Sequence, residues 1–478
     1  MNYRMITYIL GWILLFEAGF LLVPTVTALI YGEAAIKGFL LSIAICVLAS
    51  ALLIFKKPKN TALRSRDGFV IVSLSWIVLS LFGALPFMLT GVTSSYADAF
   101  FETVSGFTTT GATIFSNVEI LPRSILMWRS FTHWVGGMGV LVFIMAFLPL
   151  SGGQNMHIMK AESPGPSVSK LVPRVRTTAL LLYAIYFSLT LLEFILLLCG
   201  GQMSAFEALN TSFSTAGTGG FGFRNDSLGS FNAYTQIVVA IFMLLFSLNF
   251  SSYFLLIKGK LKDALNSELR VFFVIVIVAV ATVTVNIRHL FGSVGEALRH
   301  ALFNISSIIS TTGFSSADFD LWPNFARATL VLLMFIGACA GSTGGGMKVS
   351  RIIIYFKTML RELHAAIHPK QVKKISMDGK PIDDTVVRSA LGYLVAFVML
   401  FAVSVLAISI DNYDFTTNFT AVAATMGNIG PGLNTVGPTC NFAFFSIPSK
   451  LVLSFDMLAG RLELFPMLLL FTPTTWKK

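Results

Sequence analysis

Four short stretches rich in glycine, threonine and serine interrupt an otherwise apolar chain, and each is suited to offering backbone oxygens to a cation. The stretches read FETVSGFTTTGA, LNTSFSTAGTGG, FNISSIISTTGF and TAVAATMGNIGP, and they align on Gly111, Gly219, Gly313 and Gly430. We predict that the aligned glycine of each stretch and the two residues before it bind an ion. These candidate ion-binding residues are Thr109, Thr110, Gly111, Gly217, Thr218, Gly219, Thr311, Thr312, Gly313, Asn428, Ile429 and Gly430.

The chemistry that such stretches favour is the binding of a monovalent cation whose hydration water is replaced by rings of backbone carbonyls. Glycine allows the unusual torsions and the close approach that this requires. Short Ser, Thr and Asn side chains can satisfy the backbone behind the ring without filling it. The alternative is packing of small residues between membrane helices, which is common. Four copies in register favour the cation site for the group, whereas for any single flanking threonine both interpretations stay open.

A second glycine-rich stretch, GSTGGGMK, falls near the middle of a predicted membrane span. It does not fit a phosphate-binding loop, because Met347 stands between the last glycine and Lys348, and Val349 follows the lysine. Consecutive glycines each disfavour a helix by roughly 1 kcal/mol relative to alanine. We therefore expect a buried unwound loop below the ion site, and a simple kink for packing is the alternative. The residues of this loop that we single out are Gly341, Ser342, Thr343, Gly344, Gly345, Gly346 and Lys348.

A single charged residue, Arg461, stands out in the last predicted span. It follows Lys450, at the expected outer end of that span, by eleven residues. At about 1.5 Å per residue this places it roughly 16 Å deep, near the middle of the bilayer. A charge at this depth is costly and is usually functional. We predict that Arg461 faces the ion path and raises the barrier for cations, and an ion pair with Asp456 or Glu463 is the alternative.

The elements that must position these residues are membrane helices. The chain has 478 residues, of which 55% are hydrophobic and 12% are charged, and long apolar runs recur along it. Runs of about 20 residues can cross the hydrocarbon layer of ~30 Å as helices. The alternation that is typical of barrel strands is not seen. The first run, about 6–30, is too long for the hydrophobic part of a signal peptide. These features predict an all-α polytopic membrane protein.

Basic residues cluster in the loops on one side of the predicted spans. The positive-inside rule makes these loops and both termini cytoplasmic, because the opposite loops hold few Lys or Arg. The net charge of +11 is spread over these loops rather than gathered on a soluble domain, which argues against nucleic acid as a partner. The clusters are Lys56, Lys57, Lys59, Arg64 and Arg66; Lys160, Lys170, Arg174 and Arg176; Lys258, Lys260, Lys262 and Arg270; Lys357, Arg361, Lys370, Lys373, Lys374 and Lys380; and Lys477 and Lys478.

The spans divide into a leading hairpin and four repeats around one pore. Each repeat has a span out, a segment too short to cross, the polar stretch and a span back, which predicts about ten spans and four re-entrant half-helices. The negative end of each half-helix dipole points toward the pore axis and favours a cation. The predicted units are 1–67, 68–176, 177–270, 271–383 and 384–478. The half-helices are expected near 96–108, 204–215, 295–309 and 414–426, and the returning spans near 124–149, 231–257, 325–358 and 445–472.

At these residues the sequence resembles the Trk/Ktr/HKT superfamily of potassium transporters, which have four covalently joined pore repeats. Three further strings, GACAGSTGGGMKVSR (337–351), GNIGPGL (427–433) and AGRLELF (459–465), are similar to its bacterial TrkH/TrkG branch. The resemblance covers nearly the whole chain. It implies a homodimer with a pore in each protomer, in the bacterial inner membrane. It also implies a cytosolic ring of TrkA-type subunits, which bind the nucleotide, and no cofactor on this chain.

The resemblance also bears on single residues. It implies that the loop 341–346 is a gate and that Arg461 faces the pore. In this superfamily a serine in place of the first-repeat glycine accompanies sodium preference, so Gly111 favours potassium.

The function that these observations favour is potassium uptake through a gated, channel-like pore with a four-repeat selectivity filter. A secondary symporter that couples potassium to protons or sodium is the alternative, although such carriers usually have inverted repeats and an occluded midplane site. An enzyme is disfavoured, because the sequence shows no nucleophile–base pair and no cofactor fingerprint.

Overall fold

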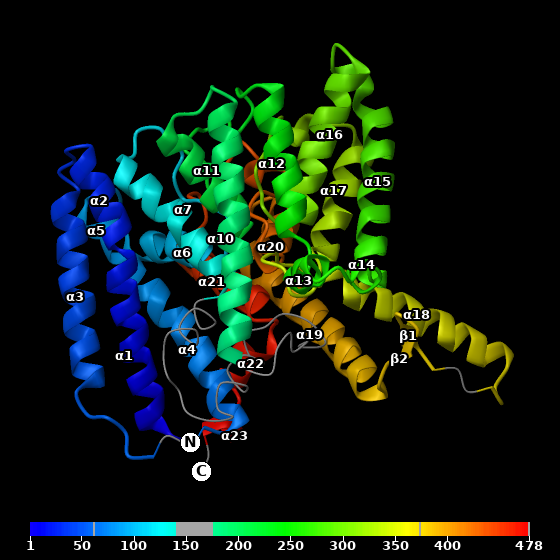
Figure 1. Ribbon diagram of the computed structural model, residues 1–478, viewed down its shortest axis with the longest axis horizontal. Coiled ribbons are helices and arrows are strands. Elements are labelled where there is room, and N and C mark those ends of the chain that lie inside the picture. The colour runs from blue at the N-terminus through cyan, green and yellow to red at the C-terminus, as the bar shows by residue number, and fades with distance from the viewer. Residues whose placement is uncertain (61–62, 140–174, 372–373, 477–478) are drawn as a thin grey trace.

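The protein is a bundle of membrane-spanning helices in the computed structural model, which describes residues 1–60, 63–139, 175–371 and 374–476 (Figure 1). Within those residues, six helices are long and apolar enough to cross a membrane, or seven if one bent pair counts as a span. The outer faces of these helices are apolar, as on α3 (Ile36–Ile54), where Leu48 is 66% and Leu52 is 81% exposed. Such faces suit lipid rather than water. The six are Tyr3–Ile30, Ile36–Ile54, Arg66–Leu89, Thr177–Cys199, Ser267–Leu290 and Asp384–Asp411.

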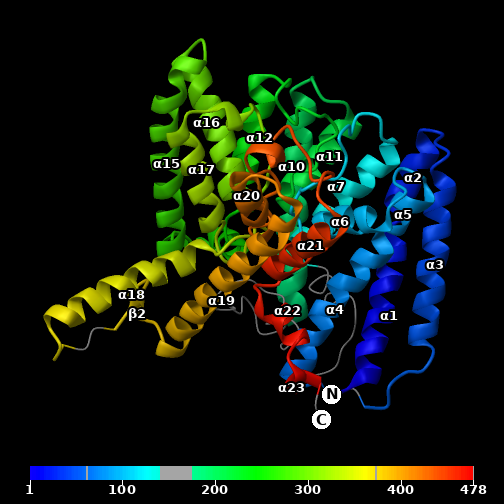
Figure 2. The ribbon, with the colours of Figure 1, turned by 180° about the vertical axis from the view of Figure 1, so that it is seen from behind.

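The leading hairpin lies at one edge of the bundle (Figure 2). Its helices pack closely because small residues meet between them, and the hydroxyl of Ser50 donates to the carbonyl oxygen of Gly11 at 2.8 Å. The hydroxyl of Tyr3 donates to the carbonyl oxygen of Trp476 at 3.3 Å, so the two ends of the chain lie on the same side. The hairpin consists of α1 (Tyr3–Phe20), α2 (Leu22–Ile30) and α3 (Ile36–Ile54).

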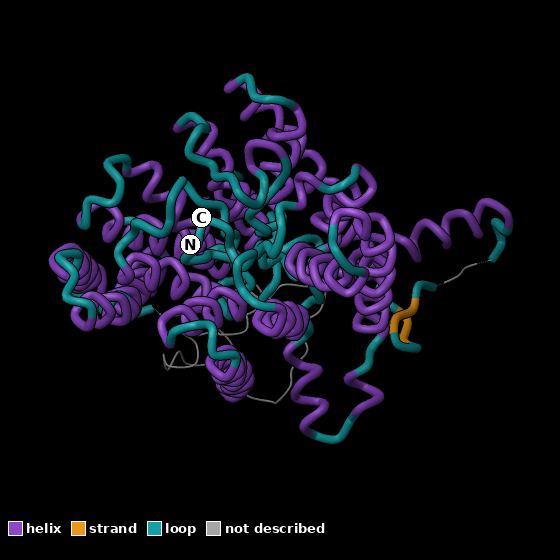
Figure 3. Tube along the Cα trace, turned by 90° about the horizontal axis from the view of Figure 1, so that it is seen from above, coloured by secondary structure: helices purple, strands orange, loops and turns teal. Residues whose placement is uncertain are grey.

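Four long helices each lead to a short helix whose C-terminal half is buried. The short helices have 12 to 16 residues, which at about 1.5 Å per residue is too little to cross a bilayer. Seen from above, loops gather in the middle of the molecule and helices surround them (Figure 3). In chain order, α4 (Ser65–Gly83) and α5 (Leu85–Leu89) lead to α6 (Tyr96–Phe107); α10 (Val175–Cys199) to α11 (Ala205–Gly217); α15 (Ser267–Ile287) and η1 (Arg288–Leu290) to α16 (Val294–Ile309); and α19 (Asp384–Ile408) and η3 (Ser409–Asp411) to α20 (Phe415–Met426).

The returning helices are shorter than the sequence predicts. In each of the stretches near 231–257, 325–358 and 445–472 the first helix ends early, after 14, 13 and 15 residues respectively. The break near 325–358 is the unwound loop that the sequence predicts, whereas the uninterrupted spans expected near 231–257 and 445–472 are wrong. The end of the span expected near 124–149 lies outside the described residues. The returning segments are α7 (Arg123–Gly137); α12 (Ala233–Phe246), α13 (Phe250–Ile257) and α14 (Leu261–Ala264); α17 (Asn324–Ile336) and α18 (Val349–Ile367), with η2 (Phe319–Leu321) before them; and α21 (Ile447–Arg461), α22 (Phe465–Leu470) and α23 (Pro473–Trp476), with η4 (Asn434–Val436) before them.

Sharp changes in backbone direction mark the ends of these helices. Between α12 and α13 the chain turns by 91°, and the side chain of Asn249 caps α13 by accepting from the backbone N–H of Ser251 at 2.8 Å. Gly337 ends α17 with a φ of 74°, and Leu464 follows α21 with a φ of 65°. These positive φ values cannot continue a right-handed helix.

Two helices project from the bundle on the side that carries the chain ends (Figure 1). They are α18 and α19. Between them lies a small antiparallel β ribbon of two strands with two residues each, β1 (Ser376–Met377) and β2 (Lys380–Pro381). Asp378 and Gly379 have φ values of 52° and 75°, as in the two-residue turns that close antiparallel hairpins. This ribbon is a small departure from the all-α prediction.

Candidate functional site

The four half-helices, α6, α11, α16 and α20, begin in the same way. At each start a side-chain oxygen accepts a hydrogen bond from the backbone N–H three residues later, which is the usual N-cap. These pairs are Ser95 with Asp98 (3.3 Å), Ser204 with Glu207 (3.3 Å), Ser293 with Glu296 (3.1 Å) and Asp414 with Thr417 (2.9 Å).

The half-helices also end alike. Just after the C-terminus of each half-helix, one residue has a left-handed backbone conformation. The N–H of the residue that follows it donates to the carbonyl of the residue five positions before that donor. This closes the helix and leaves its negative dipole end directed at the following loop. The left-handed residues are Thr109 (φ 55°), Thr218 (55°), Thr311 (61°) and Asn428 (52°). The bonds run from Thr110 to Ser105 (2.8 Å), Gly219 to Ser214 (2.9 Å), Thr312 to Ser307 (2.8 Å) and Ile429 to Ala424 (2.8 Å).

A glycine with positive φ stands two residues after each left-handed residue. The four are Gly111 (φ 83°), Gly220 (75°), Gly313 (85°) and Gly430 (99°). The alignment of the second stretch on Gly219 is therefore wrong by one residue, and its equivalent triplet is Thr218, Gly219 and Gly220. Gly217 is the last residue of α11 and precedes this triplet. The other three predicted triplets occupy equivalent positions.

These four glycines form a closed ring of contacts. A Cβ added to any one of them would overlap a backbone carbonyl oxygen of the next loop. The contacts run from Gly111 to the oxygen of Gly219, from Gly220 to that of Thr312, from Gly313 to that of Ile429, and from Gly430 to that of Thr110. Each loop touches the next, and the fourth touches the first.

Side chains behind the ring support its backbone. The hydroxyls of Thr108 and Thr110 are 2.8 Å apart, and those of Ser310 and Thr312 are 2.7 Å apart. The side-chain amide of Asn428 donates to the hydroxyl of Thr110 at 3.0 Å, so it joins the fourth loop to the first. Some of the short polar residues that the sequence places near the glycines thus bond to one another.

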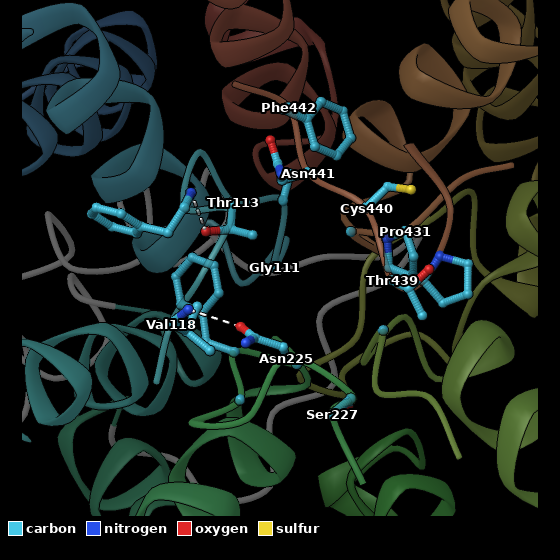
Figure 4. Close-up of a pocket in the computed structure, with 18 of the residues that line it drawn as sticks. Gly111, Thr113, Val118, Asn225, Ser227, Pro431, Thr439, Cys440, Asn441 and Phe442 are labelled. Carbon is cyan, nitrogen blue, oxygen red and sulfur yellow. Dashed lines mark hydrogen bonds between the residues drawn. The ribbon is translucent and has the colours of Figure 1, made fainter. Parts of the chain in front are cut away.

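An open pocket lies on the outer side of the ring, and all four ring glycines line it (Figure 4). Its wall includes Thr113, Asn225 and Asn441, which come from different loops. The side chain of Asn225 accepts from the N–H of Val118 at 2.9 Å, which ties the second outer loop to the first. A hydrated cation has room to reach the ring from this side.

The glycine-rich stretch between α17 and α18 is unwound from Gly337 to Lys348, as predicted, and is more than a kink. It fills the break between α12 and α13, where the N–H of Cys339 donates to the carbonyl of Ser247 and the N–H of Phe250 donates to that of Gly341, both at 3.0 Å. Near its end, the N–H of Gly345 donates to the hydroxyl of Thr311 at 2.6 Å. The loop therefore lies directly against the third loop of the ring. Its role as a gate stays a prediction.

Arg461 is the last residue of α21 and reaches this loop. Its guanidinium donates to the carbonyl of Thr343 at 2.7 Å and to the carbonyls of Gly136 and Gly137, the latter at 2.7 Å. It joins the loop to the C-terminal end of α7.

The acids and the lysine near Arg461 have partners of their own. Glu463 pairs with Arg351, and Asp456 accepts from the hydroxyl of Ser404 at 2.7 Å. The amine of Lys348 folds back onto the carbonyl of Gly344 within the loop.

Glu268, at the start of α15, holds the two ends of this loop together. One oxygen of its carboxylate accepts from the N–H of Ala340 at 2.8 Å and from that of Ser350 at 3.0 Å. Glu268→Ala should lower the free energy of unfolding by roughly 1–3 kcal/mol, because one buried and one partly buried donor lose their acceptor. Thermal unfolding in detergent measures this, with Glu362→Ala, whose side chain is 65% exposed, as the control. Equal melting temperatures for Glu268→Ala and the parent would contradict this role.

Sequence reasoning missed Gly220 and also Arg129, a buried residue of α7 that pairs with Glu102 and lines the outer pocket. The N-cap spacing could have found the first, because Ser95 and Gly111, Ser204 and Gly220, and Asp414 and Gly430 are each 16 positions apart. Arg129 gives no local signal, because the partners of its side chain lie on other segments.

Comparisons with known proteins identify the family of this chain. The sequence matches the TrkH family, described as a cation transport protein, over residues 35–478. It is 37% identical to the Trk system potassium uptake protein TrkH of Salmonella typhimurium over 100% of both chains, and 32% identical to TrkG of Escherichia coli over 99% of both. The crystal structure of the potassium transporter TrkH from Vibrio parahaemolyticus superposes with a TM-score of 0.90 at 35% identity, covering 100% of both chains.

Proposed function

Because the chain belongs to the TrkH family of cation transport proteins, and not to a family of enzymes, we propose that it takes up potassium through a gated, channel-like pore. The observation that carries this proposal is the closed ring of Gly111, Gly220, Gly313 and Gly430. Four half-helices direct their negative ends at this ring, and its backbone oxygens can replace the hydration water of a monovalent cation.

The four units that supply the ring are the proposed pore repeats. Each has a long helix, a half-helix, a ring loop and a returning helix. In the second, third and fourth units the returning segment breaks below the ring, and the end of the first returning segment lies outside the described residues. We assign these repeats the predicted ranges 68–176, 177–270, 271–383 and 384–478, with the hairpin of 1–67 outside them. The ion-binding residues in this proposal are the predicted triplets, with Thr218, Gly219 and Gly220 as the corrected second one.

The loop at 337–348 and Arg461 together form the proposed gate. The loop lies against the ring through Gly345, and Arg461 ties it to α7. A cation that leaves the ring inward must pass both the loop and a guanidinium charge. Opening requires Arg461 to release the loop carbonyl of Thr343, so movement of α21 or α18 can control the pore.

Flux into liposomes tests the transport proposal. Purified protein in liposomes should admit potassium faster than sodium, and an empty liposome preparation is the control. Equal rates for the two ions, or a rate no higher than that of empty liposomes, would contradict it.

The proposal extends to the partners and the location of the protein. We place it in the bacterial inner membrane with both chain ends in the cytoplasm, as a homodimer with one pore per protomer. A cytosolic ring of TrkA-type subunits, which hold the nucleotide, regulates the pore. Two observations support this arrangement. The chain ends lie on one side, and α18, the ribbon and α19 project on that side with exposed basic residues that include Lys370 and Lys374.

Charge reversal on this projection tests the docking of the ring. Lys370→Glu together with Lys374→Glu should weaken co-purification with the regulatory ring at least about tenfold at low salt, because the partner surface must complement the basic side chains. Lys37→Glu is the matched control, because Lys37 is exposed and lies at the end of the leading hairpin that is away from the chain termini. Unchanged binding at low salt would count against this surface. Lys373, part of the same predicted cluster, lies outside the described residues.

A further inference from the structure

A buried charge pair joins the outer ends of the first two ring loops. Glu102, on α6, and Arg129, on α7, are 0% and 2% exposed, and Nε of Arg129 lies 2.8 Å from the carboxylate of Glu102. Charges this deeply buried are costly unless they are paired and hydrogen-bonded. Here the pair has further hydrogen bonds on both sides.

Each partner of the pair holds a different loop. The carboxylate of Glu102 accepts from the N–H of Ile114 at 2.9 Å and from the hydroxyl of Thr113 at 3.0 Å, just beyond Gly111. The guanidinium of Arg129 donates to the carbonyl of Gly222 at 3.1 Å, just beyond Gly220.

The Arg129 guanidinium is held in place from two further sides. The central carbon of the guanidinium, Cζ, lies 4.1 Å from the centre of the Phe221 ring, and the guanidinium also donates to the hydroxyl of Thr113 at 3.2 Å. The pair therefore links the first loop to the second.

The half-helices of the third and fourth units hold their loops with neutral groups. The side-chain amide of Asn304 donates to the hydroxyl of Ser316 at 3.2 Å in the third unit. In the fourth, the hydroxyl of Thr420 accepts from the N–H of Leu433 at 3.0 Å. A neutral side chain is therefore enough to hold such a loop. We infer that the charges of Glu102 and Arg129 also act on the cation electrostatically.

This electrostatic effect follows from the place of Arg129. Its side chain lines the outer pocket together with the four ring glycines (Figure 4 shows this pocket). An uncompensated positive charge at this point would repel the cations that enter the ring, and Glu102 cancels it.

We propose that the Glu102–Arg129 pair controls the entry and selection of potassium. Glu102 neutralises the guanidinium charge beside the outer pocket. The planar guanidinium of Arg129, which bonds to both loops, holds the first two ring loops in position relative to each other. This inference rests on the proposed function. It makes Glu102 and Arg129 positioning residues, which act on the ion through the field at the mouth and through the ring backbone.

Three variants separate the two effects in the full-length reconstituted protein. Glu102→Gln keeps the shape and loses the charge, so potassium conductance should fall about tenfold or more, the range over which local fields change ion entry. Glu102→Gln with Arg129→Gln should recover most of that conductance, because no charge is left, but should lower the potassium-to-sodium permeability ratio. Arg129→Lys should keep the conductance and lower the ratio, because lysine is a point charge without the planar fork.

Glu296→Gln is the matched control, because it removes an acid from an exposed pair with Arg299 on α16 and should leave both readouts at parental values. Parental conductance and ratio in Glu102→Gln would overturn the inference, as would a double variant that conducts no better than Glu102→Gln. If Glu102→Gln is not monodisperse after purification, Arg129→Lys decides, and an unchanged ratio overturns the inference. A parent protein that does not conduct potassium would instead overturn the proposed function.

Discussion

Gly220→Ala should abolish the discrimination between potassium and sodium, or conduction itself. Its φ of 75° is unfavourable for alanine, and the added Cβ would overlap the carbonyl oxygen of Thr312 in the neighbouring loop. Either the loop moves or the oxygen turns away, and both change the ring that replaces hydration water. A loss of at least about tenfold in the permeability ratio corresponds to only about 1.4 kcal/mol of differential stabilisation.

Gly222→Ala is the matched control for this prediction. Gly222 lies two residues further along the same loop, and its added Cβ would meet nothing closer than 3.5 Å. The ratio of potassium to sodium permeability should therefore stay near the parental value. If Gly220→Ala and Gly222→Ala behave alike, then Gly220 is not part of the selective ring.

Arg461→Ala should raise the basal potassium flux about tenfold or more in the absence of any partner. The guanidinium holds the loop through the carbonyl of Thr343 and places a positive charge beside the inward path. In surroundings of low dielectric constant such a charge adds on the order of several kcal/mol to the barrier for a cation. Removing it should lower the barrier and free the loop together.

A shortened loop, with residues deleted within Gly341 to Gly346, should have a similar effect. Because Arg461 contacts the loop directly, the effects of the two changes should be non-additive in the double variant. Arg327→Ala, which removes a partly exposed arginine paired with Asp320 at 3.0 Å, is the control and should leave flux unchanged. Basal flux at the parental level in both single variants and the double variant would rule out the gate.

The long outward helices and the half-helices follow from sequence, because apolar length and N-capping are local properties. The break between α12 and α13 does not. No glycine or proline stands at Ser247–Asn249, and the break depends on hydrogen bonds from the loop at 337–348 to Ser247 and Phe250. A segment nearly one hundred residues away therefore ends a helix that its own sequence would continue.

The candidate site also has features that its local sequence predicts and features that depend on distant contacts. Glycine and threonine mark all four ring loops, but three glycines at 217, 219 and 220 leave the register of the second loop ambiguous until the cap of its half-helix is considered. Arg461 is recognisable by its depth in an apolar span. Its contact with Gly137 joins positions 324 apart, and a contact of that range leaves no trace in a single sequence.

The reversal potential of the purified, reconstituted protein tests the central claim most directly. Potassium, sodium and proton gradients are imposed separately across a bilayer that contains the protein alone. The account predicts a reversal potential that follows the potassium gradient, responds weakly to sodium and does not move with pH. A reversal potential that shifts with the proton or sodium gradient in a fixed ratio to potassium would contradict the channel-like pore and identify a coupled symporter.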